Sequence, residues 1–329
     1  MTEHPFAQYI QILGKGQHGA RSLTLQEAEQ AMAMILSGGV KAVQLGAFLM
    51  LMRVKEETPE ELAGFVQAAR ASLGEMPANT PVDLDWASYA GKRRHLPWFL
   101  LSALLLASHG ISVLMHGVRG GSEERVYIPE ALQALGITVA ESREEAAQSL
   151  SNHHFAYIPL DVLSPQLDQF LKLKSLLGLR SPVHTIVRML NPFDALTSIM
   201  GIFHPGYDET HQLAGALLKD QNLAVFKGEG GEAERNPDVA CRVKMILAGE
   251  AMNEEWPALF QNRHLKDADM NVSRLAQLWR GETDDEYGVA SVLATAAIAL
   301  RAMGRASSMA DAEKEAARLW SDRDQGYLG

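Results

Sequence analysis

The chain has little that would direct it out of the cytoplasm. It contains a single cysteine, Cys241, so it cannot form an internal disulfide framework, and it suits a reducing compartment. Its most apolar stretch, residues 98–107, is too short to span a bilayer, and polar and acidic residues interrupt the N-terminus before any signal-like apolar run forms. The sequence therefore predicts a cytoplasmic protein without a membrane partner, in which Cys241 is a buried structural thiol.

Catalytic and metal-binding signatures are also lacking. No serine, cysteine or carboxylate pair has a spacing that specifies a nucleophile or an acid–base couple. The adjacent His153 and His154 do not have the spacing of metal ligands, and we expect them at the surface. The sequence therefore predicts no catalytic residue, no metal site and no cofactor.

Basic residues are in the minority, with 30 lysines and arginines against 40 acidic residues and a net charge of −10. This balance argues against a general polyanion binder. The cations are clustered, however, at residues 15–21, 92–94 and 172–188. A local basic groove is therefore compatible with an acidic chain.

The first 74 residues predict a small helical domain. Thr24 and Glu27 form a capping box at the start of a helix that ends before Gly38-Gly39. A later helix begins at Thr58-Pro59, a cap followed by a proline at the first helical position. Residues 43–54 are apolar almost all round, which is typical of a helix packed between neighbours or against another subunit.

From residue 78 onward, helices alternate with short apolar strands. Helices are predicted at residues 97–108 and 129–136. Strands are predicted at residues 111–115, 155–158, 223–226 and 243–246. This alternation predicts a larger α/β domain with a mainly parallel central sheet, over residues 78–163 and 191–329.

Several motifs resemble those of anthranilate phosphoribosyltransferase. They are Arg21-Ser22-Leu23-Thr24-Leu25-Gln26-Glu27-Ala28, Gln44-Leu45-Gly46, Met115-His116-Gly117 and Gln133-Ala134-Leu135-Gly136, and the likeness extends over nearly the whole chain. The resemblance implies that residues 164–190 return to the small helical domain and line a cleft between the two domains. It also implies a homodimer that assembles through the small helical domain.

The phosphate-binding turn of that family is degenerate in this chain. Where the family has Gly-Thr-Gly-Gly-Asp to cradle phosphoribosyl pyrophosphate, this sequence has Ala87-Ser88-Tyr89-Ala90-Gly91. The lysine of the family's Lys-His-Gly is Met115, which precedes His116 and Gly117. Because ribosyl transfer depends on positioning and neutralising the leaving pyrophosphate, we expect no transfer from this donor.

The resemblance places the family's acidic magnesium-binding pair at Ala233-Glu234, within residues 228–235, which have the sequence Gly-Glu-Gly-Gly-Glu-Ala-Glu-Arg. One interpretation is a glycine-rich acidic loop at the surface. The other is that Glu229, Glu232 and Glu234 still attract a cation.

Cations and aromatic residues surround the degenerate turn. Tyr89 and Trp98 flank a run of basic residues, and such a combination is suited to phosphate contacts and base stacking. No sequence-reading motif is visible. The candidate nucleic-acid-binding residues are Lys15, Lys92, Arg93, Arg94, Arg119, Lys172, Lys174, Arg180 and Arg188.

This substitution pattern resembles the YbiB-like proteins, a non-biosynthetic branch of the same family. The resemblance implies a non-catalytic protein that binds DNA or RNA without strong sequence preference. The alternative is a glycosyltransferase or phosphoribosyltransferase, or a phosphorolytic relative, acting on an unidentified base, with Arg119, Lys174, Arg180 and the glutamates near 229–234 as remnants of its site. A third hypothesis is a small-anion sensor with its ligand between Tyr89 and His184.

Overall fold

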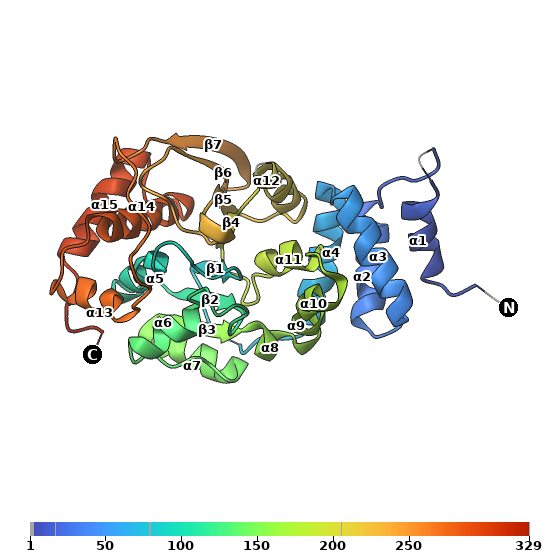
Figure 1. Cartoon of the computed structure of the whole chain (residues 1–329), viewed down its shortest axis with the longest axis horizontal. Helices are drawn as coiled ribbons and strands as arrows, with labels where there is room; N and C mark the ends of the chain where they lie inside the picture. Colours follow the sequence, from blue (N-terminus) through green and yellow to red (C-terminus); the bar gives the residue numbers. More distant parts are fainter. Residues whose placement is uncertain (1–2, 17, 79, 205, 329) are drawn as a thin grey trace.

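A seven-stranded sheet forms the centre of the larger part of the molecule. The computed structural model describes residues 3–16, 18–78, 80–204 and 206–328. The strands follow the order β3-β2-β1-β4-β5-β6-β7, in which β1 to β5 are parallel and β6 and β7 are antiparallel. They are β1 (Leu84–Ser88), β2 (Val113–Gly117), β3 (Phe155–Pro159), β4 (Thr197–Ile202), β5 (Asn222–Lys227), β6 (Cys241–Leu247) and β7 (Glu250–Trp256). The predicted fold class is therefore confirmed (Figure 1).

A bundle of helices lies beside the sheet (Figure 1). Its N-terminal members are α1 (Ala7–Gly14), α2 (Leu25–Leu36), α3 (Ala42–Lys55) and α4 (Pro59–Ser72). Both α2 and α4 begin with a complete capping box, at Thr24 and Thr58. Further short helices pack against this bundle: α8 (Leu160–Leu163), α9 (Pro165–Lys172), α10 (Lys174–Leu177), α11 (Val183–Ile186) and the 3-10 turn η1 (Val187–Met189).

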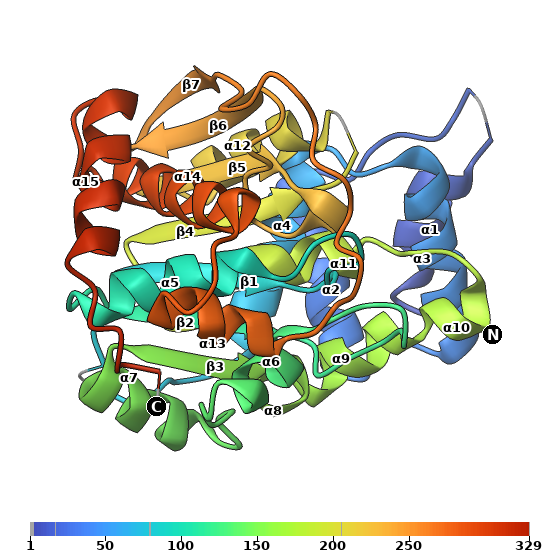
Figure 2. The same ribbon diagram turned by 60° about the vertical axis from the view of Figure 1, so that its left-hand side comes forward.

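The remaining helices flank the sheet. They are α5 (Trp98–Ser108), α6 (Ile128–Ala134), α7 (Arg143–His153), α12 (Tyr207–Leu217), α13 (Ser273–Arg280), α14 (Glu286–Ala302) and α15 (Met309–Ser321), with a 3-10 turn η2 (Glu229–Gly231). Helix α5 is buried over almost its whole circumference because α14 packs along it, as Figure 2 shows. Alternate residues of a strand face opposite sides of the sheet. In β4, accordingly, Ile199 joins the core with α5 and α14, whereas Met200 joins the core of the helical bundle.

Local patterns identified most of these elements. The predicted strands correspond to β2, β3, β5 and β6, whereas β1, β4 and β7 had no sequence prediction. Cys241 is buried, as expected. Within the described residues, none of the helices combines the length and the apolar character needed to cross a membrane.

Candidate functional site

The degenerate turn lies where the carboxyl ends of several parallel strands meet. In the register of β1 and β2, Ala87 lies opposite His116 and Ser88 opposite Gly117. A β-carbon on Gly117 would lie 1.8 Å from the carbonyl oxygen of Ser88, so only glycine permits this close approach. Ligand sites of open parallel sheets form at this edge, and the residues that follow β1, β2 and β5 converge on it.

Tyr89, at the centre of the turn, is tied to the neighbouring strand. Its hydroxyl lies 2.7 Å from Nδ1 of His116, and Nε2 of His116 lies 3.3 Å from a carboxylate oxygen of Asp85. Burial raises the pKa of Tyr89 well above its ordinary value, so the hydroxyl stays protonated. Met115, at the position of the family's lysine, is buried in the core. This part of the turn is therefore committed to internal contacts.

The acidic loop, residues 228–235, turns inward and supplies a carboxylate to the turn. The backbone N–H groups of Ala90 and Gly91 both donate to Oε1 of Glu232, at 2.6 Å each. Glu232 is fully buried, and Glu234 is 2% exposed. The interpretation as a surface loop was therefore wrong. These carboxylates are buried, and donors inside the protein take the place of the water molecules that would solvate them at the surface.

Lys92 is the cation that this loop attracts, and its assignment to nucleic-acid binding was wrong. The side chain is 1% exposed. Its ammonium lies 3.0 Å from a carboxylate oxygen of Glu229 and also contacts Glu234. Burial would lower the pKa of Lys92, but the two carboxylates raise it above its ordinary value, so the ammonium stays charged. A buried, doubly paired ammonium cannot contact a phosphate backbone.

Three further backbone donors near the turn are also occupied by the acidic loop. The amides of Arg94 and Arg93 donate to Oε1 of Glu229, at 2.7 and 3.3 Å. The amide of Phe99, at the N-terminus of α5, donates to Oε2 of Glu234 at 2.9 Å. Burial would raise the pKa of Glu229, yet Lys92 and the two arginine amides hold it below its ordinary value. We call these five donors, the N–H groups of Ala90, Gly91, Arg93, Arg94 and Phe99, the amide cradle.

Glycines allow the acidic loop to pack this closely. A β-carbon on Gly201 of β4 would lie 2.2 Å from the carbonyl carbon of Glu232, and one on Gly228 would lie 1.8 Å from its carbonyl oxygen. Gly230 has a φ of +69°, which L side chains rarely adopt. The glycine-rich pattern of this segment therefore reflects close packing against β4 and the turn.

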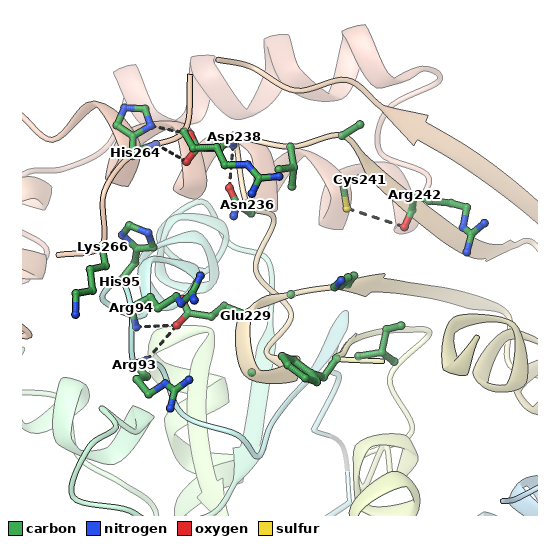
Figure 3. Close-up of a pocket in the computed structure, with 18 of the residues that line it drawn as sticks. Arg93, Arg94, His95, Glu229, Asn236, Asp238, Cys241, Arg242, His264 and Lys266 are labelled. Atoms are coloured by element: carbon green, nitrogen blue, oxygen red, sulfur yellow. Dashed lines mark hydrogen bonds and ion pairs between the residues drawn. The ribbon is translucent and has the colours of Figure 1, made fainter. Parts of the chain in front are cut away.

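A cleft of about 810 Å³ opens beside the acidic loop (Figure 3). Arg93, Arg94 and Lys266 lie toward one end of it and Arg242 toward the other. Its basic lining residues are Arg93, Arg94, Arg125, Lys227, Arg242, Arg263 and Lys266, and its acidic lining residues are Asp208, Glu229, Asp238 and Glu255. The cleft is therefore positively charged at its surface, although the whole chain is acidic.

Most of these cations have no carboxylate partner. Arg242 pairs with Asp208 at 2.9 Å, and the Arg125 guanidinium donates to the carbonyl oxygens of Ala90 and Gly91. The other five form no ion pair with any carboxylate in the part of the chain that the structure describes; they are Arg93, Arg94, Lys227, Arg263 and Lys266. Unpaired and exposed, they are available to an anionic ligand.

A smaller cavity of about 90 Å³ adjoins the cleft and shares Phe203 and Gly230 with it. Arg180, His184 and Arg188 line it. Burial, followed by the two arginine charges, lowers the pKa of His184 to about 4, so this imidazole is neutral at pH 7. Two of the candidate cations thus extend the basic surface toward the helical bundle.

The other candidates lie apart from both cavities. Arg119 pairs with Glu141 at 2.5 Å and with Asp161 at 3.0 Å. Lys172 pairs with Asp168 at 2.5 Å, and neither Lys15 nor Lys174 is among the residues that line the cavities. Of the candidates, the structure thus brings together Arg93, Arg94, Arg180 and Arg188.

Sequence reasoning missed several lining residues. Lys227 ends β5, and its position directly after a predicted strand could have identified it. Arg263 and Lys266 lie between β7 and α13, in a segment without a recognisable pattern. Their role in the cleft follows only from the tertiary fold.

The residues present do not fit a diphosphate with magnesium. The amide cradle is filled by carboxylates, and Glu229 and Glu234 face Lys92. Among the described residues, no group of three or more histidine, cysteine, aspartate or glutamate side chains is arranged to hold a metal ion.

Comparisons with known proteins identify the relatives of this chain. Residues 99–322 match the α/β domain of a glycosyl transferase family, and residues 7–73 match its helical bundle domain. The uncharacterized protein YbiB of Escherichia coli is 30% identical over 73% of this chain and 76% of its own length. An anthranilate phosphoribosyltransferase of Dictyoglomus thermophilum is 28% identical over 68% of this chain and 65% of the relative. The structure of anthranilate phosphoribosyltransferase from Thermus thermophilus superposes with a TM-score of 0.76 over 99% of both chains, at 22% identity.

The buried position of Lys92 predicts a large loss of stability when its charge is removed. Lys92→Met leaves Glu229 and Glu234 without their counter-ion, and breaking a buried pair in this way costs about 3 to 5 kcal/mol. Urea unfolding measures the change. Lys227→Met, the same substitution at an exposed lysine, is the control and should shift the free energy of unfolding by no more than about 0.5 kcal/mol. Equal stability of the two variants would contradict the buried network.

His211 predicts a pH-dependent loss of stability. Burial lowers its pKa to about 4, and its Nε2 has no hydrogen-bond partner among the described residues. The unfolded chain therefore binds more protons between about pH 6.5 and pH 4, and stability falls as the pH decreases through this window, by up to about 3 kcal/mol. In urea unfolding from pH 7 to pH 4, His211→Gln should flatten the profile. The exposed His153→Gln is the control, and a change of slope there would refute the assignment.

Proposed function

We propose that this chain, which belongs to the glycosyl transferase family and is a homologue of the anthranilate phosphoribosyltransferases, binds nucleic acid without catalysing ribosyl transfer. The proposal takes account of the amide cradle, which is filled by the protein's own carboxylates. The ligand would be DNA or RNA, held by its phosphate backbone without strong sequence preference. The observation that carries the proposal is the set of five unpaired cations along one cleft of an acidic protein.

The form of the cleft supports a polymeric ligand. Lys227 extends from the end of β5, whereas Arg263 and Lys266 come from the segment before α13, so the cations are spread along the opening. A single phosphate would use only part of this surface. A chain of phosphates can contact several cations at once and release a counter-ion at each contact.

Phe203 supplies an aromatic surface between the two cavities. Its side chain is 50% exposed, and its ring packs edge-on against His204 at a centroid distance of 4.9 Å. Base stacking on an exposed aromatic ring tolerates any sequence, because every base has a π-face. This arrangement favours a single-stranded ligand, or one with unpaired bases.

The second candidate function is glycosyl or phosphoribosyl transfer to an unidentified base. The names of several relatives support it, and so does the small cavity lined by Arg180 and Arg188. Thermal shift distinguishes the two functions, since a ligand stabilises the state that binds it. Stabilisation by phosphoribosyl pyrophosphate with magnesium supports transfer, and salt-sensitive stabilisation by an oligonucleotide supports nucleic-acid binding.

Binding of a mixed-sequence oligonucleotide should weaken steeply with salt. For Arg263→Gln/Lys266→Gln we expect weaker binding and a salt dependence reduced by about two units of slope, one for each cation that no longer neutralises a phosphate. Fluorescence anisotropy over a range of salt concentrations measures both quantities. Lys219→Gln/Lys314→Gln removes the same charge from exposed lysines outside the cleft and should bind like the parent protein. Indistinguishable titrations of the two variants would overturn the cleft assignment.

We also propose that the protein is a homodimer assembled through the helical bundle. Val43 and Val54, at opposite ends of α3, are 80% and 84% exposed in the single chain. A second copy would remove this apolar surface from water. Val43→Lys/Val54→Lys should therefore shift the protein toward the monomer in sedimentation experiments. Leu265→Lys, at a residue that is 90% exposed but far from α3 in the sequence, is the control.

A further inference from the structure

The acidic loop meets the amide cradle in the way that a bound anion would. Three carboxylates of one loop, those of Glu229, Glu232 and Glu234, accept from every donor of the cradle. Two adjacent backbone amides that converge on one oxygen form a typical anion site, and so does the N-terminus of a helix. The ligand of this anion site is part of the protein itself.

Glu232 is the central member of the set. Both turn amides point at its Oε1, while its Oε2 is buried without a hydrogen bond among the described residues. A buried carboxylate oxygen without a partner is costly, so an incidental contact is a poor explanation for its position. Burial lowers the pKa of Arg188, but the negative charge of Glu232 counteracts this effect. The charge of Glu232 thus acts on an arginine that lines the smaller cavity, although the two side chains form no ion pair among the described residues.

The packing of the loop opposes its displacement. The Glu232 backbone passes so close to Gly201 that any β-carbon there would collide with it. Arg125, whose guanidinium holds the carbonyl oxygens of Ala90 and Gly91, lies against Gly230. An external phosphate would have to compete with a carboxylate that is already in place and that repels it.

From these contacts we infer that Glu232 is a specificity-determining residue, which closes the amide cradle to small diphosphates and leaves only the cations of the cleft for an anionic ligand. This inference rests on the proposed function and deepens it. A mononucleotide or pyrophosphate finds no donors in the cradle, and a polymer gains affinity from many weak contacts along the cleft. Glu232 therefore accounts both for the exclusion of small diphosphates and for the binding of polymeric anions along the cleft.

Isothermal titration with inorganic pyrophosphate tests the inference. Glu232→Ala frees the cradle amides of Ala90 and Gly91 and removes one charge, and we expect its affinity for pyrophosphate to exceed that of the parent protein by at least about tenfold. Glu232→Gln keeps a carbonyl oxygen near the amides but loses the charge, so its gain should be smaller. Glu250→Gln removes an exposed carboxylate that belongs neither to the cradle nor to the cleft, and it should behave like the parent.

Each outcome decides the question. Pyrophosphate binding by the parent as tight as by Glu232→Ala overturns the inference, and so does a folded Glu232→Ala variant without any gain. If Glu232→Ala does not fold, which circular dichroism reveals, the absence of a gain in Glu232→Gln overturns it instead. Oligonucleotide titrations of the parent are run in parallel. Failure of the parent to bind oligonucleotide refutes the proposed function, whereas the pyrophosphate result bears on Glu232 alone.

Discussion

The site depends on the acidic loop, whose carboxylates accept from backbone donors and neutralise the ammonium of Lys92. These contacts join the turn after β1 to the loop after β5, although β4 separates these strands in the sheet. The components are individually unfavourable in a protein interior, because a buried carboxylate or ammonium loses its hydration. Together they satisfy one another: Lys92 faces Glu229 and Glu234, and the amides of the cradle donate to all three carboxylates. The network therefore ties Glu229, which lines the cleft, to the turn after β1.

The network also explains how an acidic chain comes to have a basic cleft. Carboxylates of the acidic loop point inward and are screened by amides, by the N-terminus of α5 and by Lys92. Five cations at the opening have no carboxylate partner among the described residues; they are Arg93, Arg94, Lys227, Arg263 and Lys266. Net charge describes the whole molecule, whereas a ligand responds to the local field of the cleft. The excess of acidic residues is thus no obstacle to a polyanion at this surface.

Much of the fold was predictable because its signals are local. The capping boxes at Thr24 and Thr58 and the apolar run of α5 each depend on residues a few positions apart. The site was less predictable because its contacts are distant. Lys92 meets a carboxylate 142 positions later, and lysine is rarely buried without such a partner. No local pattern distinguishes it from Arg93, which is exposed.

This chain shares its fold with anthranilate phosphoribosyltransferase, and its amide cradle holds carboxylates of its own acidic loop. A carboxylate tethered within a loop acts at a high effective concentration and loses little freedom on binding, whereas a free diphosphate must be captured from solution. Replacing an external anion by an internal one therefore requires only residues on one loop and glycines that let it approach. The sheet, the helical bundle and the strand ends need not change, because the amides belong to the backbone. In this chain Glu232 stands between the turn amides and any ligand, so its function is argued from the acidic loop and not from the fold alone.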